Sequence, residues 1–202
     1  MKSITAKGYK VEFTKKQYII LNDFVEWQQY SSVFVLADTN TEEHCLPLFL
    51  SKLSTEATIE IISIEAGEEN KNIETCSGVW NVLSELGADR KSLLINLGGG
   101  VVTDLGGFVA STFKRGIDFI NIPTTLLSMV DASVGGKTGV DLGALKNQVG
   151  VIVNPKMVLV DPQYLKTLSS EEYRSGYAEM LKHGLIQDQD YWNHLKDYKK
   201  IS

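Results

Sequence analysis

A run of three glycines between an apolar strand and a helix is the feature that most constrains this fold. Residues 92–97 (SLLINL) have the length and apolarity of a buried strand, glycines occupy 98–100, and 101–112 are predicted to be helical. A glycine backbone lacks the Cβ atoms that would keep a pyrophosphate away, and the helix start offers free N–H groups. The pattern therefore favours a nucleotide-binding turn over a tight turn without a ligand. Thr103 stands where a third glycine is expected and the turn lies well along the chain, so we predict a variant of the dinucleotide-binding fold.

Strands and helices alternate along the first 168 residues. Such alternation is typical of a parallel sheet covered by helices. The expected strands are 33–37, 58–63, 117–122 and 157–160, after a hairpin over 3–14, and the expected helices are 22–30, 41–53 and one that ends near Leu86 before Gly87.

Only helices are predicted after Leu168. Ser169 and Glu172 fit a capping box, the helix that follows continues to about Ile186, and a further helix contains residues 191–195. We therefore predict an α/β protein with a Rossmann-like, parallel-sheet nucleotide-binding domain at 1–168. Residues 169–202 are expected to begin an all-helical domain that the chain leaves incomplete.

Composition excludes several classes of partner. The 202 residues are 43% hydrophobic and 22% charged, with a formal net charge of −5. These values are typical of a globular protein and give no support to nucleic acid or an anionic membrane as a partner. No segment approaches the ~20 apolar residues of a membrane-spanning helix. Cys45 and Cys76 lack metal-ligand spacing and no signal peptide is evident, which together predict a reducing, cytoplasmic location.

Polar side chains with two possible uses follow the glycine turn. Thr124 and Thr125 come after a proline, where their hydroxyl groups could bind a ligand or cap a helix, the commoner use. Lys137 follows a Gly-Gly pair and Lys146 precedes Asn147; lysines in glycine-rich loops suit phosphates or carboxylates. The sequence GGKTG lacks the upstream glycine of a Walker loop, so ATP binding is not favoured.

Three further positions each have a structural and a functional interpretation. Asp38 follows a strand and could either accept hydrogen bonds from an adenosine ribose or cap the next helix. Glu179, Lys182 and His183 share one helix face by their spacing, where a solvated charged face is favoured over a metal site with two ligands. Arg115 could be a surface charge or an anion contact.

From Asp38 to Asp188 the chain resembles the 3-dehydroquinate synthase family of sugar phosphate cyclases. The resemblance covers most of the chain and is specific, since the motifs occur in the family's order and spacing. Thr103 is a small departure from the glycine often found there. The motifs are GGGVVTDLGGF, FKRG, PTTLLSMVDASVGGKTGVD, KNQVG, NP…D and E…SGYAEMLKHG.

The resemblance implies that some of these residues bind the cofactor and others bind the substrate. NAD would be held by Asp38, Glu68, Lys71, Gly99, Gly100, Val101, Val102, Asp104, Thr124, Thr125 and Thr167. The sugar phosphate would contact Asp131, Lys137, Lys146, Asn147 and Lys182, with Lys137 and Lys146 also counted among the cofactor contacts. Arg115 would reach into a neighbouring subunit's active site, which implies a homodimer.

The resemblance also implies a metal and a reaction. Glu179 would bind zinc (or cobalt) in the helical, metal- and substrate-binding domain, whereas His183 is not a ligand position in the family. The other two zinc ligands would be histidines beyond residue 202, so these 202 residues alone are expected to bind NAD at best and not to turn over. The implied reaction converts 3-deoxy-D-arabino-heptulosonate 7-phosphate to 3-dehydroquinate and phosphate.

Three alternatives stay open. A related cyclase of the deoxy-inosose or valiolone type would close another sugar phosphate, although Lys146 and Asn147 with Lys137 and Arg115 favour the dehydroquinate enzyme. A metal-dependent polyol or glycerol-phosphate dehydrogenase would release NADH. An NAD-binding fragment would have no activity.

Overall fold

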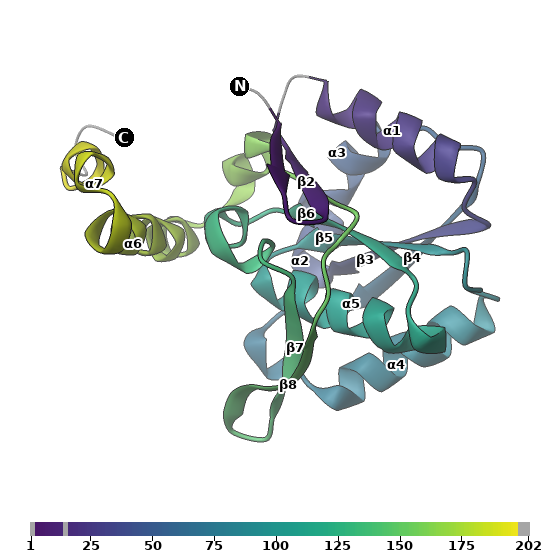
Figure 1. Ribbon diagram of the computed structural model, residues 1–202. Coiled ribbons are helices and arrows are strands. Elements are labelled where there is room, and N and C mark those ends of the chain that lie inside the picture. Colours follow the sequence, from purple (N-terminus) through teal and green to yellow (C-terminus); the bar gives the residue numbers. More distant parts are fainter. Residues whose placement is uncertain (1–2, 14–15, 198–202) are drawn as a thin grey trace.

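The computed structural model describes residues 3–13 and 16–197 and is built on a seven-stranded sheet with helices on both faces (Figure 1). The strand order is β1-β2-β9-β6-β5-β3-β4, and every neighbouring pair is parallel except the β1–β2 hairpin. The strands of this sheet are β1 (Ile4–Ala6), β2 (Tyr9–Glu12), β3 (Ser32–Asp38), β4 (Thr58–Ile64), β5 (Leu93–Gly98), β6 (Asp118–Pro123) and β9 (Met157–Leu159). The mixed α/β fold with a mostly parallel sheet is therefore as predicted.

Two hydrophobic cores cover the two faces of the sheet. Successive residues of a strand point to opposite faces, so Val33 and Val35 join one core while Phe34 and Leu36 join the other. The first core is closed by α1 (Gln17–Gln28) and α3 (Leu46–Leu50), and the second by α4 (Ile73–Glu85) and α5 (Gly100–Thr112). The short helix α2 (Thr39–His44) precedes α3 and contributes no residue to the first core cluster as the structure describes it. Both faces of the central strands are buried, which explains why their sequences are apolar runs.

Helix α5 lies unusually close to the sheet because of one glycine. A Cβ atom at Gly106 would lie 2.0 Å from Asn96 Oδ1 and 2.9 Å from Leu36 Cδ2. Asn96 is itself completely buried and donates a hydrogen bond to Asn121 Oδ1 at 2.9 Å, which joins β5 to β6. The close approach brings the first turn of α5 next to the strand ends.

Two of the expected helices have different bounds. The helix predicted at 22–30 begins at Gln17 and ends at Gln28. The helix predicted at 41–53 begins at Thr39 and is interrupted at Cys45, because Pro47 lies in the first turn of α3 and has no N–H to continue a hydrogen-bonded helix.

The largest difference from the prediction is a two-stranded hairpin where glycine-rich loops were expected. Strands β7 (Lys137–Leu142) and β8 (Leu145–Ile152) pair with each other and not with the main sheet. The hairpin packs on α5, where a Cβ atom at Gly107 would lie 2.4 Å from Thr138 Cγ2. Gly143, with a φ of 59°, provides the tight turn between the strands.

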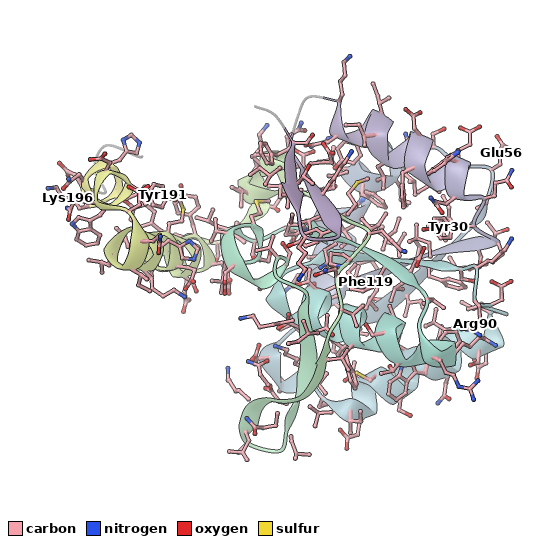
Figure 2. All side chains as sticks on the ribbon, in the orientation of Figure 1. Tyr30, Glu56, Arg90, Phe119, Tyr191 and Lys196 are labelled. Carbon is pink, nitrogen blue, oxygen red and sulfur yellow. The ribbon has the colours of Figure 1, made fainter. Side chains whose placement is uncertain are left out.

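The last helices, α6 (Ser170–Gln187) and α7 (Gln189–Leu195), extend away from the sheet (Figure 1). They share a small core in which Leu126, Tyr177 and Leu195 are buried. Figure 2 shows Tyr30, Glu56 and Arg90, which precede β3, β4 and β5, at one end of the sheet, and Tyr191 and Lys196 on the far side. The helices therefore extend from the end at which the parallel strands finish. Within the described residues, none of the helices combines the length and apolarity needed to cross a bilayer.

Candidate functional site

A cavity of about 780 Å³ lies at the carboxyl ends of β3, β5 and β6. The chain runs from β3 outward to β4 and then returns to the other side of β3 to form β5, so β3 and β5 flank a reversal of strand order. In open parallel sheets this is where ligands bind. Residues that line the cavity include Asp38, Glu68, Lys71, Gly99, Gly100, Val101, Asp104, Thr124, Thr125 and Thr167.

The glycine turn forms one wall of this cavity. Gly98 ends β5, Gly99 is the N-cap, and α5 begins at Gly100. The amide N–H groups of the first turn have no acceptor within the helix and carry the positive end of its dipole. Thr103, at the position of the expected third glycine, is buried, and its hydroxyl donates to Gly99 O at 3.2 Å. Val102 is buried in the core, so only its backbone N–H can serve a ligand.

The segment after β6 forms the opposite wall. Thr124 N–H donates to Gly98 O at 2.9 Å, which holds the two strand ends together. The Thr125 hydroxyl accepts from Ser128 N–H at 3.2 Å and so caps the following turn, as the structural interpretation predicts. A π-helical turn, Ser128–Ala132, then carries Asp131. Such π turns are rare in proteins, and many of those that occur lie at functional sites.

The hydroxyl group of Thr124, in the same wall, is poorly hydrogen-bonded among the described residues. The Thr124 side chain is buried, and its Oγ1 has no hydrogen-bond partner of good geometry among the described residues. The thiol of Cys45 lies beside it: burial raises the pKa of Cys45, and hydrogen bonds with Thr167 and Thr124 oppose that rise. A buried hydroxyl without a good partner next to a cavity is available for a ligand.

Asp38 caps α2, as one of its two interpretations predicts. Its Oδ1 accepts from Thr41 N–H at 2.8 Å, while Thr41 Oγ1 accepts from Asp38 N–H at 2.9 Å, forming a reciprocal capping box. The residue also lines the cavity, so the ribose contact stays a prediction.

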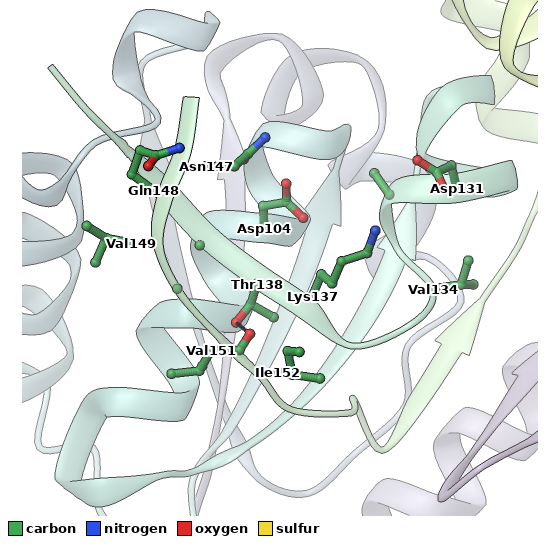
Figure 3. A pocket seen from close by; sticks show the side chains of 13 residues that line it. Asp104, Asp131, Val134, Lys137, Thr138, Asn147, Gln148, Val149, Val151 and Ile152 are labelled. Carbon is green, nitrogen blue, oxygen red and sulfur yellow. Dashed lines mark hydrogen bonds between the residues drawn. The ribbon is translucent and has the colours of Figure 1, made fainter. Parts of the chain in front are cut away.

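A second cavity of about 600 Å³ adjoins the first under the β7–β8 hairpin. The two share Asp104, Asp131, Ala132 and Asn147 as lining residues. Figure 3 shows the Lys137 side chain pointing from β7 toward the space between Asp104 and Asp131. One cationic side chain therefore faces two carboxylates at the junction of the cavities.

Lys71 hydrogen-bonds to two of the residues that line both cavities. Its buried ammonium donates to Asp104 Oδ2 at 2.6 Å and to Asn147 Oδ1 at 2.7 Å. Burial raises the pKa of Asp104, and the ion pair with Lys71 opposes that rise. Lys146 forms a separate and exposed ion pair with Glu68 at 3.1 Å, which screening by solvent weakens. The loop 65–71 and the hairpin are thus joined by two pairs of side chains.

A group of possible metal ligands lies beside the junction. One ligand atom from each of Asp131, Glu179 and His183 lies within 4.8 Å of the others. The pairing predicted for this helix face is present, since Glu179 forms an ion pair with Lys182 and its Oε1 lies 3.2 Å from His183 Nε2. The hydrogen bond to Glu179 raises the pKa of Lys182. No local pattern in the sequence linked Asp131 to this face.

Arg115 lies apart from these residues. It follows the carboxyl end of α5, in the short helical turn Phe113–Arg115, whereas the cavities lie at the amino end of that helix. Its backbone φ is 69°, and its side chain is exposed. Within one chain it is separated from the other predicted site residues.

Gln148 is a site residue that the sequence analysis missed, since it lines the second cavity. Asp141, also of the hairpin, lines neither cavity but accepts a hydrogen bond from Asn147 N–H. The signal that could have revealed the hairpin is the Gly143–Ala144 pair between two short alternating segments, because a glycine followed by another residue suits a two-residue turn.

Comparison with known families gives one matching model, described as 3-dehydroquinate synthase N-terminal, over residues 61–175. Proteins named 3-dehydroquinate synthase from Parabacteroides distasonis and Clostridium beijerinckii are 48% and 45% identical to this chain over 181 and 168 residues. These alignments cover 90% and 83% of this chain and 51% and 48% of the relatives. The chain therefore spans about half the length of the curated relatives it matches.

Solved structures of related cyclases have the same fold. A 2-epi-5-epi-valiolone synthase from Streptomyces hygroscopicus subsp. jinggangensis, with NAD+ and Zn2+ bound, has a TM-score of 0.78 at 29% identity; the match covers 94% of this chain and 53% of that one. A 2-deoxy-scyllo-inosose synthase complexed with carbaglucose-6-phosphate, NAD+ and Co2+ has a TM-score of 0.81 at 24% identity, covering 88% and 49%. The second likeness concerns the fold alone.

Proposed function

Because the chain belongs to the 3-dehydroquinate synthase family, we propose that it supplies the NAD and substrate cavities of a lyase of the shikimate pathway. The reaction converts 3-deoxy-D-arabino-heptulosonate 7-phosphate to 3-dehydroquinate and phosphate. The observation that carries this proposal is the pair of adjoining cavities, one at the glycine turn and one under the lysine-bearing hairpin. Residues that line both can face a cofactor on one side and a substrate on the other.

The first cavity fits NAD. The start of α5 offers free N–H groups to a pyrophosphate, and the buried hydroxyl of Thr124 lacks a good partner. Asp38 keeps Oδ2 available while Oδ1 caps α2. We assign residues 1–168 to an NAD-binding domain on these grounds. Valiolone synthase, the related structure at 29% identity, was solved with NAD+ and Zn2+, which supports the same cofactors here.

The second cavity suits a charged sugar phosphate. Lys137 extends into it, and Asn147 reaches its junction with the first cavity, so a phosphate or carboxylate can meet both a cation and an amide. Lys146 and Lys182 add positive charge at exposed positions nearby. Arg115 would come from the second subunit of a homodimer, which is consistent with its distance from the cavities of its own chain.

The donors beside the junction fit a divalent cation in part. Asp131, Glu179 and His183 provide two carboxylates and an imidazole, a set suited to zinc or cobalt. The Lys182 ammonium, now paired with Glu179, would have to turn away to admit the ion. We propose Glu179 as the metal ligand and place 169–202 in the metal- and substrate-binding domain.

The chain's own residues would orient the reactants and balance charge. When bound, NAD supplies reversible hydride acceptance and the divalent ion supplies polarisation of a substrate hydroxyl. Lys137 would neutralise charge on the substrate as phosphate is lost. Asn147 would hold a hydroxyl or carboxylate oxygen by donating from its amide. Lys71, by pairing with Asp104, keeps that carboxylate from facing the anionic substrate alone.

The proposal is tested by measuring released phosphate and 3-dehydroquinate with NAD and zinc present, on a longer version of this chain. We expect both products in equal amounts without accumulation of NADH, and no reaction with other sugar phosphates such as glucose 6-phosphate. Turnover of another sugar phosphate would favour the related cyclases, and net NADH would favour a dehydrogenase. NAD binding without turnover would favour the fragment interpretation. The same assay, applied to these 202 residues, tests whether they turn over alone.

A matched pair of lysine variants tests the assignment of the second cavity. K137A is expected to lower kcat/KM by about ten- to a hundredfold, because a charge-assisted contact is lost. The Kd for NAD should stay within about twofold, because Lys137 lines the second cavity and not the first as the described residues form them, although the resemblance also counts it among the cofactor contacts. K91A, at the opposite end of the sheet, serves as the control with unchanged kinetics. Equal kinetics for K137A and K91A would remove Lys137 from the substrate site.

A further inference from the structure

The hairpin that carries Asn147 contains an irregularity centred on Asp141. Val140 pairs with Val149 and Leu142 pairs with Leu145, so one residue of β7 stands opposite three of β8. The three residues on the longer side are Lys146, Asn147 and Gln148. Bulges of this kind turn side chains out of the regular strand alternation and occur next to active sites.

A closed ring of three hydrogen bonds joins this bulge to the loop before α4. Asp141 Oδ1 accepts from Asn147 N–H at 2.7 Å, and Asn147 Oδ1 accepts from Lys71 Nζ at 2.7 Å. Asp141 N–H donates to Lys71 O at 2.9 Å and completes the ring. Lys71 also holds Asp104 of α5, so the ring continues to the helix that starts at the glycine turn.

Asn147 needs this support because of its backbone conformation. Its φ is 55°, in the left-handed region that side-chain-bearing residues rarely adopt. Asparagine tolerates this region better than most residues, but the conformation persists only where the surroundings hold it. Asn147 is exposed, so no packing against a core holds it. The hydrogen bond that its N–H donates to Asp141 Oδ1 fixes its backbone.

We propose that Asp141 is a positioning residue that holds Asn147 at the junction of the two cavities and thereby aligns the substrate cavity with the NAD cavity. This inference rests on the proposed function for its kinetic consequences. The required property is an acceptor oxygen at Asp141 and not its charge, because the partner is a backbone N–H. An asparagine at this position retains such an oxygen, whereas alanine does not.

The first test uses the variants D141A and D141N. The control is D23A, which removes an exposed carboxylate on α1. Hydrogen exchange at the Asn147 amide is expected to speed up about tenfold or more in D141A and to stay within about threefold of wild type in D141N. D23A should leave this exchange unchanged. The role is overturned if D141A exchanges like wild type, or if D141N is as fast as D141A.

A double-mutant cycle keeps the proposal falsifiable if D141A is unstable. Glycine adopts a φ of 55° without strain, so N147G no longer needs Asp141 to hold its backbone. The effect of D141A on exchange at position 147 should therefore be smaller in the N147G background than in wild type. Equal effects in both backgrounds would overturn the positioning role. Because exchange needs no turnover, this outcome is independent of the proposed reaction.

Kinetics and cofactor binding separate positioning from general stability. D141A is expected to raise KM for the sugar phosphate about tenfold and the Kd for NAD by no more than about threefold, with D141N restoring both. A merely structural loss would lower the active fraction and leave KM unchanged. That result, or failure of D141N to restore KM, would contradict the inference. These kinetics are measured on the longer version of the chain, and absence of any turnover by it would instead count against the proposed function.

Discussion

Cys76 shows how burial of a single ionisable residue ties stability to pH. The thiol is completely buried on the α4 side of the sheet, and burial raises its pKa from 9.0 to about 12. The unfolded chain therefore releases this proton at a lower pH than the folded protein. The contribution of the protonated Cys76 thiol to the free energy of unfolding is fully present below pH 9. It is lost as pH rises above 9, by up to about 1.4 kcal/mol per pH unit.

The C76A variant should show a shallower loss of stability between pH 9 and pH 10. Denaturant unfolding at several pH values measures this slope, which is compared instead of the absolute stability because the smaller side chain also leaves a cavity. Burial also raises the pKa values of Cys45, Tyr18, Tyr30 and Tyr164, so both proteins still lose stability in alkali. Identical slopes for the two proteins would show that Cys76 does not contribute.

Gly106 and Gly78 form a second residue-scale comparison. Both lie inside helices, but a Cβ atom at Gly106 would lie 2.0 Å from Asn96 Oδ1, whereas one at Gly78 would meet no described atom within 4 Å. We expect G106A to lower the free energy of unfolding by about 1–3 kcal/mol through overpacking. G78A should raise it by about 0.5–1 kcal/mol because alanine favours the helix. Denaturant titration of both variants measures the difference; a stable G106A protein would mean that α5 can move away from β5.

At the scale of elements, two neighbouring threonines between β6 and the π turn are expected to differ in role, Thr124 in NAD binding and Thr125 in stability. Thr124 Oγ1 is buried without a good partner, so the isosteric T124V removes a hydroxyl that the free protein does not use well. The free energy of unfolding should stay equal or rise by up to about 1 kcal/mol. If the hydroxyl binds NAD, the Kd measured by calorimetry should rise about tenfold. T125V, which removes the hydroxyl that caps the turn, should instead lower stability.

At the scale of the whole molecule, Arg115 tests whether two subunits share each site. If the protein forms the proposed homodimer, R115A and K137A dimers should each keep at most about a tenth of wild-type activity, since each lacks one contact to substrate at every site. Mixing and re-forming the dimers gives half heterodimers, each with one complete site, so activity should recover to about a quarter of wild type. Activity is measured as phosphate release before and after mixing. No recovery, with heterodimers present, would place Arg115 outside the partner's site.

Local patterns in the sequence predicted much of the fold and part of the site. The strand-glycine-helix turn, the helix that ends before Gly87 and the Ser169 cap each depend on contacts within a few residues, and each is present. The helix interruption at Cys45 was missed, although Pro47 is a local signal for it. The β7–β8 hairpin was also missed, although Gly143 is a local signal for its turn. A glycine such as Gly143 suits a ligand-binding loop as well as a tight turn, so this signal for the hairpin is ambiguous.

Residues far apart in the chain were brought together only by the tertiary structure. Asp131 lies beside Glu179 and His183 because the π turn after β6 packs against α6, and no periodicity within either segment reports that contact. The contact of Lys71 with Asn147 likewise depends on how the hairpin crosses α5. Local patterns along the chain indicated most of the main-sheet strands and helices, the glycine turn and the family, because these depend on neighbouring residues. Strand order and helix packing decided which side chains share a cavity, because those contacts join segments whose separation no local pattern encodes.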